Sequence, residues 1–342
     1  MPAERPKSRA LVWPIAGAAC CIAALVVCVM VGHAAWRGWL AATVLGMALP
    51  TGAVGLVMTM RLIPGAWARN AAPFLQQEAL LLPIGAAALL PVLIRMRAIF
   101  IWVGQHQDTP FRAVWLTAPF FIARAVIWIA VMAGLWRLLR RKDAPPAVSC
   151  VGLLLFLVLG TFAASDWVQS LDPAFNSSGF GLEIISFEML TALALGLVIG
   201  LLSPAPMERQ GAVGGLLLTL LLFWAYLAFM PYFITWSGDV PAAAVWYLKR
   251  GRGVWAAVAI LVALCRFVPM FLLLFTQVRN GRRWLLGVAL AVLVGSIPEA
   301  AWLTLPAAPG APGADLWTVL AYLLALAGLG SFGWMRLRGA ST

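Results

Sequence analysis

Apolar runs of about twenty residues recur along the whole chain, separated by short polar linkers. A run of that length can cross the hydrocarbon core of a bilayer as one helix, with every backbone hydrogen bond made inside the segment. Stretches such as VGLLLFLVLGTFAA do not alternate apolar and polar residues, as the strands of a membrane β-barrel would. The sequence therefore predicts an all-α, polytopic integral membrane protein.

Ten such runs can be placed, and no soluble domain fits between them. Hydrophobic residues make up 63% of the 342 residues and charged residues only 11%, whereas a soluble domain carries about 25% charged residues. We expect one transmembrane domain over residues 11–336, with short tails at 1–10 and 337–342. The predicted spans are Leu11–Val31, Trp39–Met60, Phe74–Ile94, Ala113–Trp136, Val148–Ala164, Leu182–Leu202, Val213–Thr235, Val254–Gln277, Trp284–Leu305 and Leu316–Met335.

The chain has a net charge of +12, and its Lys and Arg residues are distributed unevenly among the linkers. With ten spans both termini lie on one side, and that side holds about twice as many basic residues as the other. Because basic loops stay on the cytoplasmic side, we expect both termini in the cytoplasm and the chain in a bacterial inner membrane. The lipid bilayer is then the first partner, and the pattern argues against nucleic acid.

Histidines and cysteines are too few and too scattered to predict a metal centre. The histidines are His33 and His106, and the five cysteines form no C-x-x-C motif. We therefore predict no metal site and no covalently bound cofactor. The sequence GLGSFG at residues 328–333 fits a nucleotide-binding fingerprint only in form, because it lies in an apolar run without a preceding strand. Close packing of helices through small residues explains it better.

Ionisable residues inside a span are costly to bury, so each is a candidate for function. Arg124 and Arg266 fall deep within predicted spans, so each should face the bundle and have a partner. Carboxyl groups that are buried can exchange protons near neutral pH, and those of several spans are expected in one leaflet. The alternative is that they are solvated helix ends or structural ion pairs. The candidates for a proton path are Glu78, Asp166, Glu188, Asp239 and Glu299.

Two longer stretches carry a family resemblance. The first is D-W-x-x-S-L-x-P followed by F-x-S-x-x-F-G, from Asp166 to Gly181. The second is FWAYLAFMPYFITWSGDVPAAAVWYLKR, from Phe223 to Arg250. Both resemble the second large membrane subunit of alternative complex III, which belongs to the polysulfide-reductase membrane-subunit superfamily. That complex oxidises quinol and passes the electrons to cytochrome c or another acceptor.

The resemblance implies a ten-helix subunit that carries no metal cofactor itself. Such a subunit packs beside a related quinol-binding subunit and the haem and iron–sulfur subunits of the complex, meets quinone through that complex, and offers a proton path. The family often has Gln at Met230 or Pro231, Glu at Ala242 and Ala243, and His at Arg266, so several protonatable groups are missing here. The residues carried over by motif position are Asp166, Ser170, Asp172, Tyr232, Asp239 and Trp246.

Three functions fit these observations. The first is a cofactor-free, non-catalytic subunit of a quinol-oxidising complex, which contributes a proton path and a docking surface. The second is a proton-coupled secondary transporter, because Pro269 and Pro298 can break helices and broken helices often form binding sites. The third is a purely structural or assembly subunit.

Overall fold

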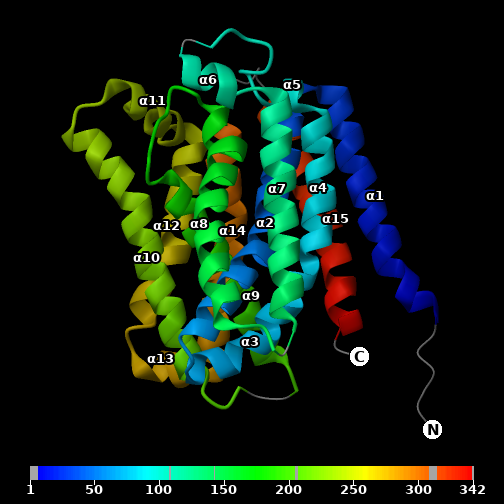
Figure 1. The fold of residues 1–342 in the computed structure, drawn as a ribbon, viewed down its shortest axis with the longest axis vertical. Helices are drawn as coiled ribbons and strands as arrows, with labels where there is room; N and C mark the ends of the chain where they lie inside the picture. The colour runs from blue at the N-terminus through cyan, green and yellow to red at the C-terminus, as the bar shows by residue number, and fades with distance from the viewer. Residues whose placement is uncertain (1–6, 108, 142, 205–206, 308–313, 341–342) are drawn as a thin grey trace.

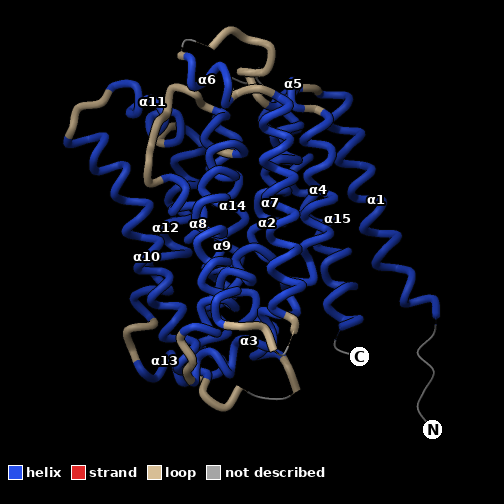
Figure 2. Tube along the Cα trace, viewed as in Figure 1, coloured by secondary structure: helices blue, strands red, loops and turns tan. Residues whose placement is uncertain are grey.

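The structure is a computed structural model that describes residues 7–107, 109–141, 143–204, 207–307 and 314–340. Within these ranges the chain forms helices joined by loops and turns, and it contains no strand (Figure 2). Ten helical segments of the described chain are long and apolar enough to cross a membrane. The prediction of an all-α polytopic membrane protein is therefore confirmed.

The long helices run side by side in one bundle and alternate in direction (Figure 1). Helix α1 begins and helix α15 ends at the same end of the bundle, which we call the terminal end. The opposite end, where the short helices α5, α6 and α11 lie, is called the loop end. The helices are α1 Lys7–Val31, α2 His33–Leu62, α3 Ala66–Glu78, η1 Ala79–Leu81, α4 Leu82–Ile94, α5 Met96–Ile99, α6 Pro110–Trp115, α7 Ala118–Leu139, α8 Pro146–Trp167, η2 Gln169–Leu171, α9 Phe180–Leu202, α10 Gln210–Ser237, α11 Pro241–Arg250, α12 Gly253–Leu272, α13 Thr276–Asn280, α14 Arg282–Thr304, η3 Leu305–Ala307 and α15 Ala314–Ala340.

Several predicted span boundaries differ from the structure. The fourth span begins at Ala118 rather than Ala113, because α6 ends at Trp115 and α7 starts as a separate helix. The eighth span ends at Leu272, and the following residues turn into α13. Helices α1 and α15 continue into the predicted tails, while residues 1–6 and 341–342 lie outside the described residues.

The third span is broken into α3, η1 and α4. Pro83 explains the break, because proline has no N–H with which to reach the carbonyl of Ala79. That carbonyl instead accepts a tighter hydrogen bond from the N–H of Leu82, which forms the 3₁₀ turn. Glu78, the last residue of α3, is thereby placed directly at the break.

Helices α2 and α9 form the centre of the bundle, and most of their residues are buried. They touch at Gly52, where an added Cβ atom would lie 2.1 Å from the backbone oxygen of Glu188. At the edge of the bundle α1 packs on α15 in a similar way, since a Cβ atom on Gly328 would lie 2.9 Å from the backbone oxygen of Gly17. Small residues thus let helix backbones approach closely, as expected for the GLGSFG segment.

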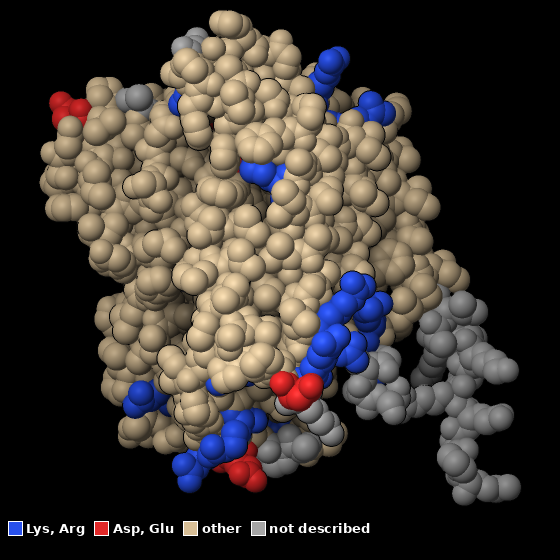
Figure 3. Space-filling model, in the orientation of Figure 1, with Lys and Arg blue, Asp and Glu red and all other residues tan. Residues whose placement is uncertain are grey.

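Charged side chains gather toward the two ends of the molecule and leave an almost uncharged belt between them (Figure 3). Many large apolar side chains are exposed on α1, α10 and α12, for example Val26, Phe229 and Ile260. Outside a membrane such a surface would be an aggregation hazard, whereas in a bilayer it contacts lipid. The belt therefore agrees with ten membrane spans.

The contact at Gly52 can be tested by Gly52→Ala. We expect this substitution to lower the stability of the purified protein by about 1–3 kcal/mol, because the new methyl group meets backbone that cannot move aside. The measurement is the melting temperature in detergent. Gly287→Ala in α14 is the matched control, since nothing lies within 4 Å of its Cβ position. Equal melting temperatures for the two variants would contradict the close contact of α2 and α9.

Candidate functional site

Arg124 of α7 forms a two-point ion pair with Asp166 of α8. Its Nε and Nη2 atoms donate to the two carboxylate oxygens at 2.6 and 2.8 Å, and both side chains are buried. The guanidinium also lies over the ring of Trp115, at 4.0 Å from its centroid. Arg124 therefore has the buried partner that the sequence led us to expect. Both carboxylate oxygens of Asp166 accept hydrogen bonds from this arginine.

Arg266 of α12 forms a second buried ion pair, with Glu299 of α14. Both Nε and Nη2 of Arg266 donate to Oε2 of Glu299, the first at 2.9 Å. The other carboxylate oxygen accepts a hydrogen bond of 2.7 Å from the indole N–H of Trp224 on α10. One acidic side chain therefore ties together three transmembrane helices.

The hydrogen bonds continue from Arg266 toward the centre of the bundle. Its Nη2 atom donates to the hydroxyl of Ser296 at 3.0 Å, and that hydroxyl is 2.9 Å from the hydroxyl of Thr191 on α9. Polar groups thus run without interruption from Trp224 on α10 to Thr191 on α9. Hydroxyl groups in such a row can pass a proton along or can simply satisfy one another.

The two stretches that carry the family resemblance meet at the loop end. Lys249 of α11 donates to Asp172 at 2.9 Å, next to the turn η2. Phe175 stacks on Trp246, with ring centroids 4.6 Å apart and planes 18° apart. Tyr232 of α10 touches the ring of Tyr247, with centroids 5.3 Å apart. We call Asp172, Phe175, Trp246, Tyr247, Lys249 and Arg250 the loop-end cluster.

Ser170 links the first stretch to the ion pair of Arg124. Its hydroxyl donates to the backbone oxygen of Asp166 at 2.5 Å and accepts from the indole of Trp102 at 3.1 Å. These bonds fix the chain between the end of α8 and the turn η2. Ser170 is thus placed to hold the conformation of the motif.

Arg250 completes the loop-end cluster and caps helix α14. It donates to the backbone oxygens of Trp302 and Leu303, which lack partners within the helix because α14 ends at Thr304. Its guanidinium lies 3.8 Å from the centroid of the Trp246 ring. A cation at a helix C-terminus is also favoured by the helix dipole.

Burial lowers the pKa of the Arg250 guanidinium to about 9, while the nearby Asp172 and Glu183 act in the opposite direction. The guanidinium therefore stays protonated at neutral pH. Burial also raises the pKa of the Tyr247 phenol, and the charge of Glu183 adds to this effect. The charge of Glu183 on α9 therefore acts on Tyr247 and Arg250 of the loop-end cluster.

Among the described residues, two carboxyl groups are buried without an ionic partner. Glu78 is fully buried, neither of its oxygens has a hydrogen-bond donor, and Oε1 would lie 2.9 Å from a Cβ atom on Gly196 of α9. Glu188 is also buried, with one oxygen unbonded and the hydroxyl of Thr51 beside the carboxyl group. An unpaired carboxylate is costly in an apolar interior, whereas the neutral acid is tolerated.

Glu78 and Glu188 lie at different depths of the bundle. Glu188 and Gly196, the neighbour of Glu78, are eight residues apart on α9, which corresponds to roughly 12 Å along the helix. Glu188 lies nearer the loop end and Glu78 nearer the terminal end. The two groups therefore mark separate points along a path across the bundle.

The carboxyl groups that were expected in one leaflet have different partners in the structure, and Glu78 belongs to another part of the bundle. Asp166 and Glu299 each face an arginine, and Glu78 and Glu188 lie apart. Asp239 is exposed in the turn between α10 and α11, with a positive φ of 46°, which agrees with the alternative of a solvated helix end. Helix ends next to a tight turn are solvated, which is why this residue faces away from the bundle.

Sequence reasoning missed Arg37. Arg37 lies in the first turns of α2, is buried, and leaves its Nε and Nη1 atoms without a partner. It was counted with the linkers because the predicted span began at Trp39, and no local pattern shows that α2 begins at His33. Asp172 of the loop-end cluster acts on Arg37 electrostatically.

A metal ion would need a group of ligating side chains, and one apolar cavity reaches into the centre of the bundle. No group of three or more His, Cys, Asp and Glu residues within the described ranges is arranged to hold a metal ion. An apolar cavity of about 360 Å³ between α2, α4, α9, α14 and α15 reaches the Thr191 hydroxyl. That hydroxyl is already paired with Ser296, and no carboxyl or imidazole lines the cavity, so it offers no acceptor for the protons of a quinol.

Comparison of the sequence with protein-family models and with curated proteins gives no match.

The ion pair of Arg266 and Glu299 can be tested by a pair of substitutions. Arg266→Met should destabilise the protein by about 3–5 kcal/mol, because it leaves the Glu299 carboxylate unpaired inside the bundle. Adding Glu299→Leu should recover most of this loss, because two apolar side chains then replace the two charges. Thermal unfolding in detergent measures both. A double variant no more stable than Arg266→Met would contradict the buried pair.

Proposed function

We propose that this chain is an integral membrane subunit of a quinol-oxidising respiratory complex similar to alternative complex III. The main support is the loop-end cluster, because the two stretches with the family resemblance are 77 residues apart at Asp172 and Lys249 yet form one site there. The contacts between them involve the carried-over residues Asp172 and Trp246. Matched residues that meet in space favour a shared origin over a chance likeness.

In this proposal the quinol is oxidised by a neighbouring subunit rather than by this chain. The cavity that reaches Thr191 lacks a proton acceptor, and no set of described side chains forms a metal site. The chain instead contributes docking surface and the buried carboxyl groups Glu78 and Glu188. Both termini are placed in the cytoplasm of a bacterium by the excess of basic residues on that side.

The proton path runs in two parts. From the terminal end a proton reaches Glu78 at the break of the third span, and further along it reaches Glu188 near the centre of the bundle. Glu78 has no donor on either oxygen, so it can gain or lose a proton without breaking an existing bond. The ion-paired Asp166 and Glu299 are fixed by arginine and hold the scaffold around this path.

Purification of the chain from its own membranes under mild detergent tests the assembly. We expect a multihaem cytochrome, a large iron–sulfur protein and a second ten-helix subunit to purify with it, because the resemblance implies these partners. Quantitative mass spectrometry of the purified material is the measurement. Recovery of the chain without any redox subunit would contradict the proposal.

The proton path is tested in the assembled complex by Glu78→Gln and Glu188→Gln. In vesicles, each variant should lower the number of protons moved per electron while electron transfer continues, because the amide cannot carry a proton. Glu208→Gln is the control, since this residue is exposed in the linker before α10. If both variants move as many protons per electron as the wild type, the proton path is contradicted and the purely structural role is favoured.

A proton-coupled transporter is a second candidate, and the break of the third span favours it. Interrupted membrane helices often bind substrates and ions at the break, and here the break carries the unpartnered Glu78. Uptake of a solute by the purified chain alone in vesicles, driven by a pH gradient and lost in Glu78→Gln, would favour this function over the first.

A further inference from the structure

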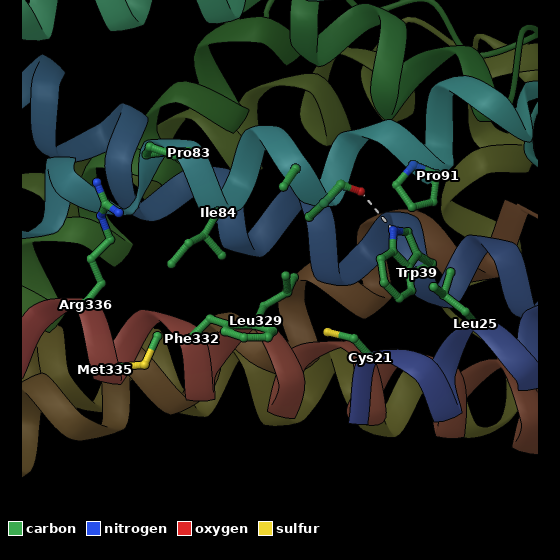
Figure 4. Close-up of a pocket in the computed structure, with 12 residues that line it drawn as sticks. Cys21, Leu25, Trp39, Pro83, Ile84, Pro91, Leu329, Phe332, Met335 and Arg336 are labelled. Carbon is green, nitrogen blue, oxygen red and sulfur yellow. Dashed lines mark hydrogen bonds between the residues drawn. The ribbon is translucent and has the colours of Figure 1, made fainter. Parts of the chain in front are cut away.

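An apolar groove opens on the side of the bundle (Figure 4). Its lining residues come from α1, α2, α4 and α15. Its volume is about 700 Å³. Along α4 it extends from Pro83 to Pro91, which is roughly 12 Å of helix. The wall is formed mainly by aliphatic and aromatic side chains and by the small residues Ala87 and Ala88.

The groove adjoins the cavity of about 360 Å³ that reaches Thr191. Ile84 and Leu329 line both hollows, so these two side chains form the partition between them. Both hollows extend to the last turns of α15, one at Arg336 and the other at Trp334 and Leu337. Both hollows are apolar and both reach the last turns of α15, and we call them the two channels.

One cation lines the groove at the last turns of α15, which both channels reach. Arg336 is the charged residue among those that line the groove, and its side chain extends from α15 toward Pro83 at the end of α4 (Figure 4). None of the ion pairs and hydrogen bonds found among the described residues involves Arg336. Its guanidinium is exposed and free to bind an anion.

The neighbouring residues are those of a membrane interface. Arg338 lies over the ring of Trp334, with its guanidinium carbon 4.4 Å from the ring centroid. Tryptophan is enriched at the level of lipid headgroups, and basic residues near the end of a span attract anionic lipid. Arg336 is therefore at the depth of a headgroup, with the two channels reaching from it into the hydrocarbon layer.

We propose that this groove and the adjoining cavity bind one anionic, two-chain phospholipid, with its phosphate on Arg336 and one acyl chain in each channel. Two channels divided by Ile84 and Leu329 fit two chains joined at one headgroup, which a helix of a partner protein would not fill. The lone arginine supplies the charge that selects an anionic headgroup. This inference is independent of the proposed respiratory function.

The test uses the purified full-length protein and native mass spectrometry with equal amounts of phosphatidylglycerol and phosphatidylethanolamine. The wild type should retain one phosphatidylglycerol in preference to phosphatidylethanolamine, and excess glycerol phosphate should not displace it. Arg336→Gln should lower retention of phosphatidylglycerol about fivefold, which corresponds to one cation at a membrane surface. Ala87→Phe, at an exposed position in the groove wall, should reduce retention of both lipids.

Arg137→Gln is the matched control, because Arg137 is also exposed near the terminal end but does not line the groove. It should retain phosphatidylglycerol as the wild type does. The inference is overturned if Arg137→Gln and Arg336→Gln lose the lipid equally, or if the wild type retains both lipids equally. It is also overturned if a diacylglycerol without phosphate, or an isoprenoid quinone, competes as well as phosphatidylglycerol.

Discussion

A bilayer offers no water to a buried polar group, so each such group must find its partner within the protein. In this chain three buried arginines meet this demand for oxygen atoms of neighbouring helices. Arg124 and Arg266 each bind a carboxylate through two nitrogen atoms, and Arg250 binds the free carbonyl oxygens at the end of α14. The five donors and planar shape of arginine allow one side chain to join several helices at once. These contacts fix how α7 lies on α8 and how α12 lies on α14.

The groups that break this rule are therefore informative. Glu78, Glu188 and Arg37 are buried and keep polar atoms without partners within the described protein, as do single atoms of Arg124, Trp128 and Ser149. Leaving such groups unpaired costs free energy, and the cost is greater for a full charge than for a neutral acid. Apolar residues at these positions would fill the same space without that cost. Their presence near a helix break, near the bundle centre and beside the loop-end cluster is what gives the proposed proton path its physical basis.

Much of the fold could be predicted from the sequence, because span length and hydrophobicity are local properties. Ten spans and the need for a partner at Arg124 and Arg266 both follow from the energy of a charge in an apolar medium. The identity of each partner could not be predicted, since Asp166 lies 42 residues from Arg124 and Glu299 lies 33 residues from Arg266. Pairing depends on which helices become neighbours, and a single sequence carries no signal for that. Arg37 lies outside the predicted span for a different reason, since no local pattern shows that α2 begins at His33.

The position of α1 has a consequence for biosynthesis. This helix packs mainly on α15, the last helix of the chain, and exposes much of its remaining surface. A ribosome delivers the first helix to the membrane long before the last one. During translation α1 is therefore exposed to lipid, with α2 as an early neighbour. It reaches its final position only after α15 has been inserted.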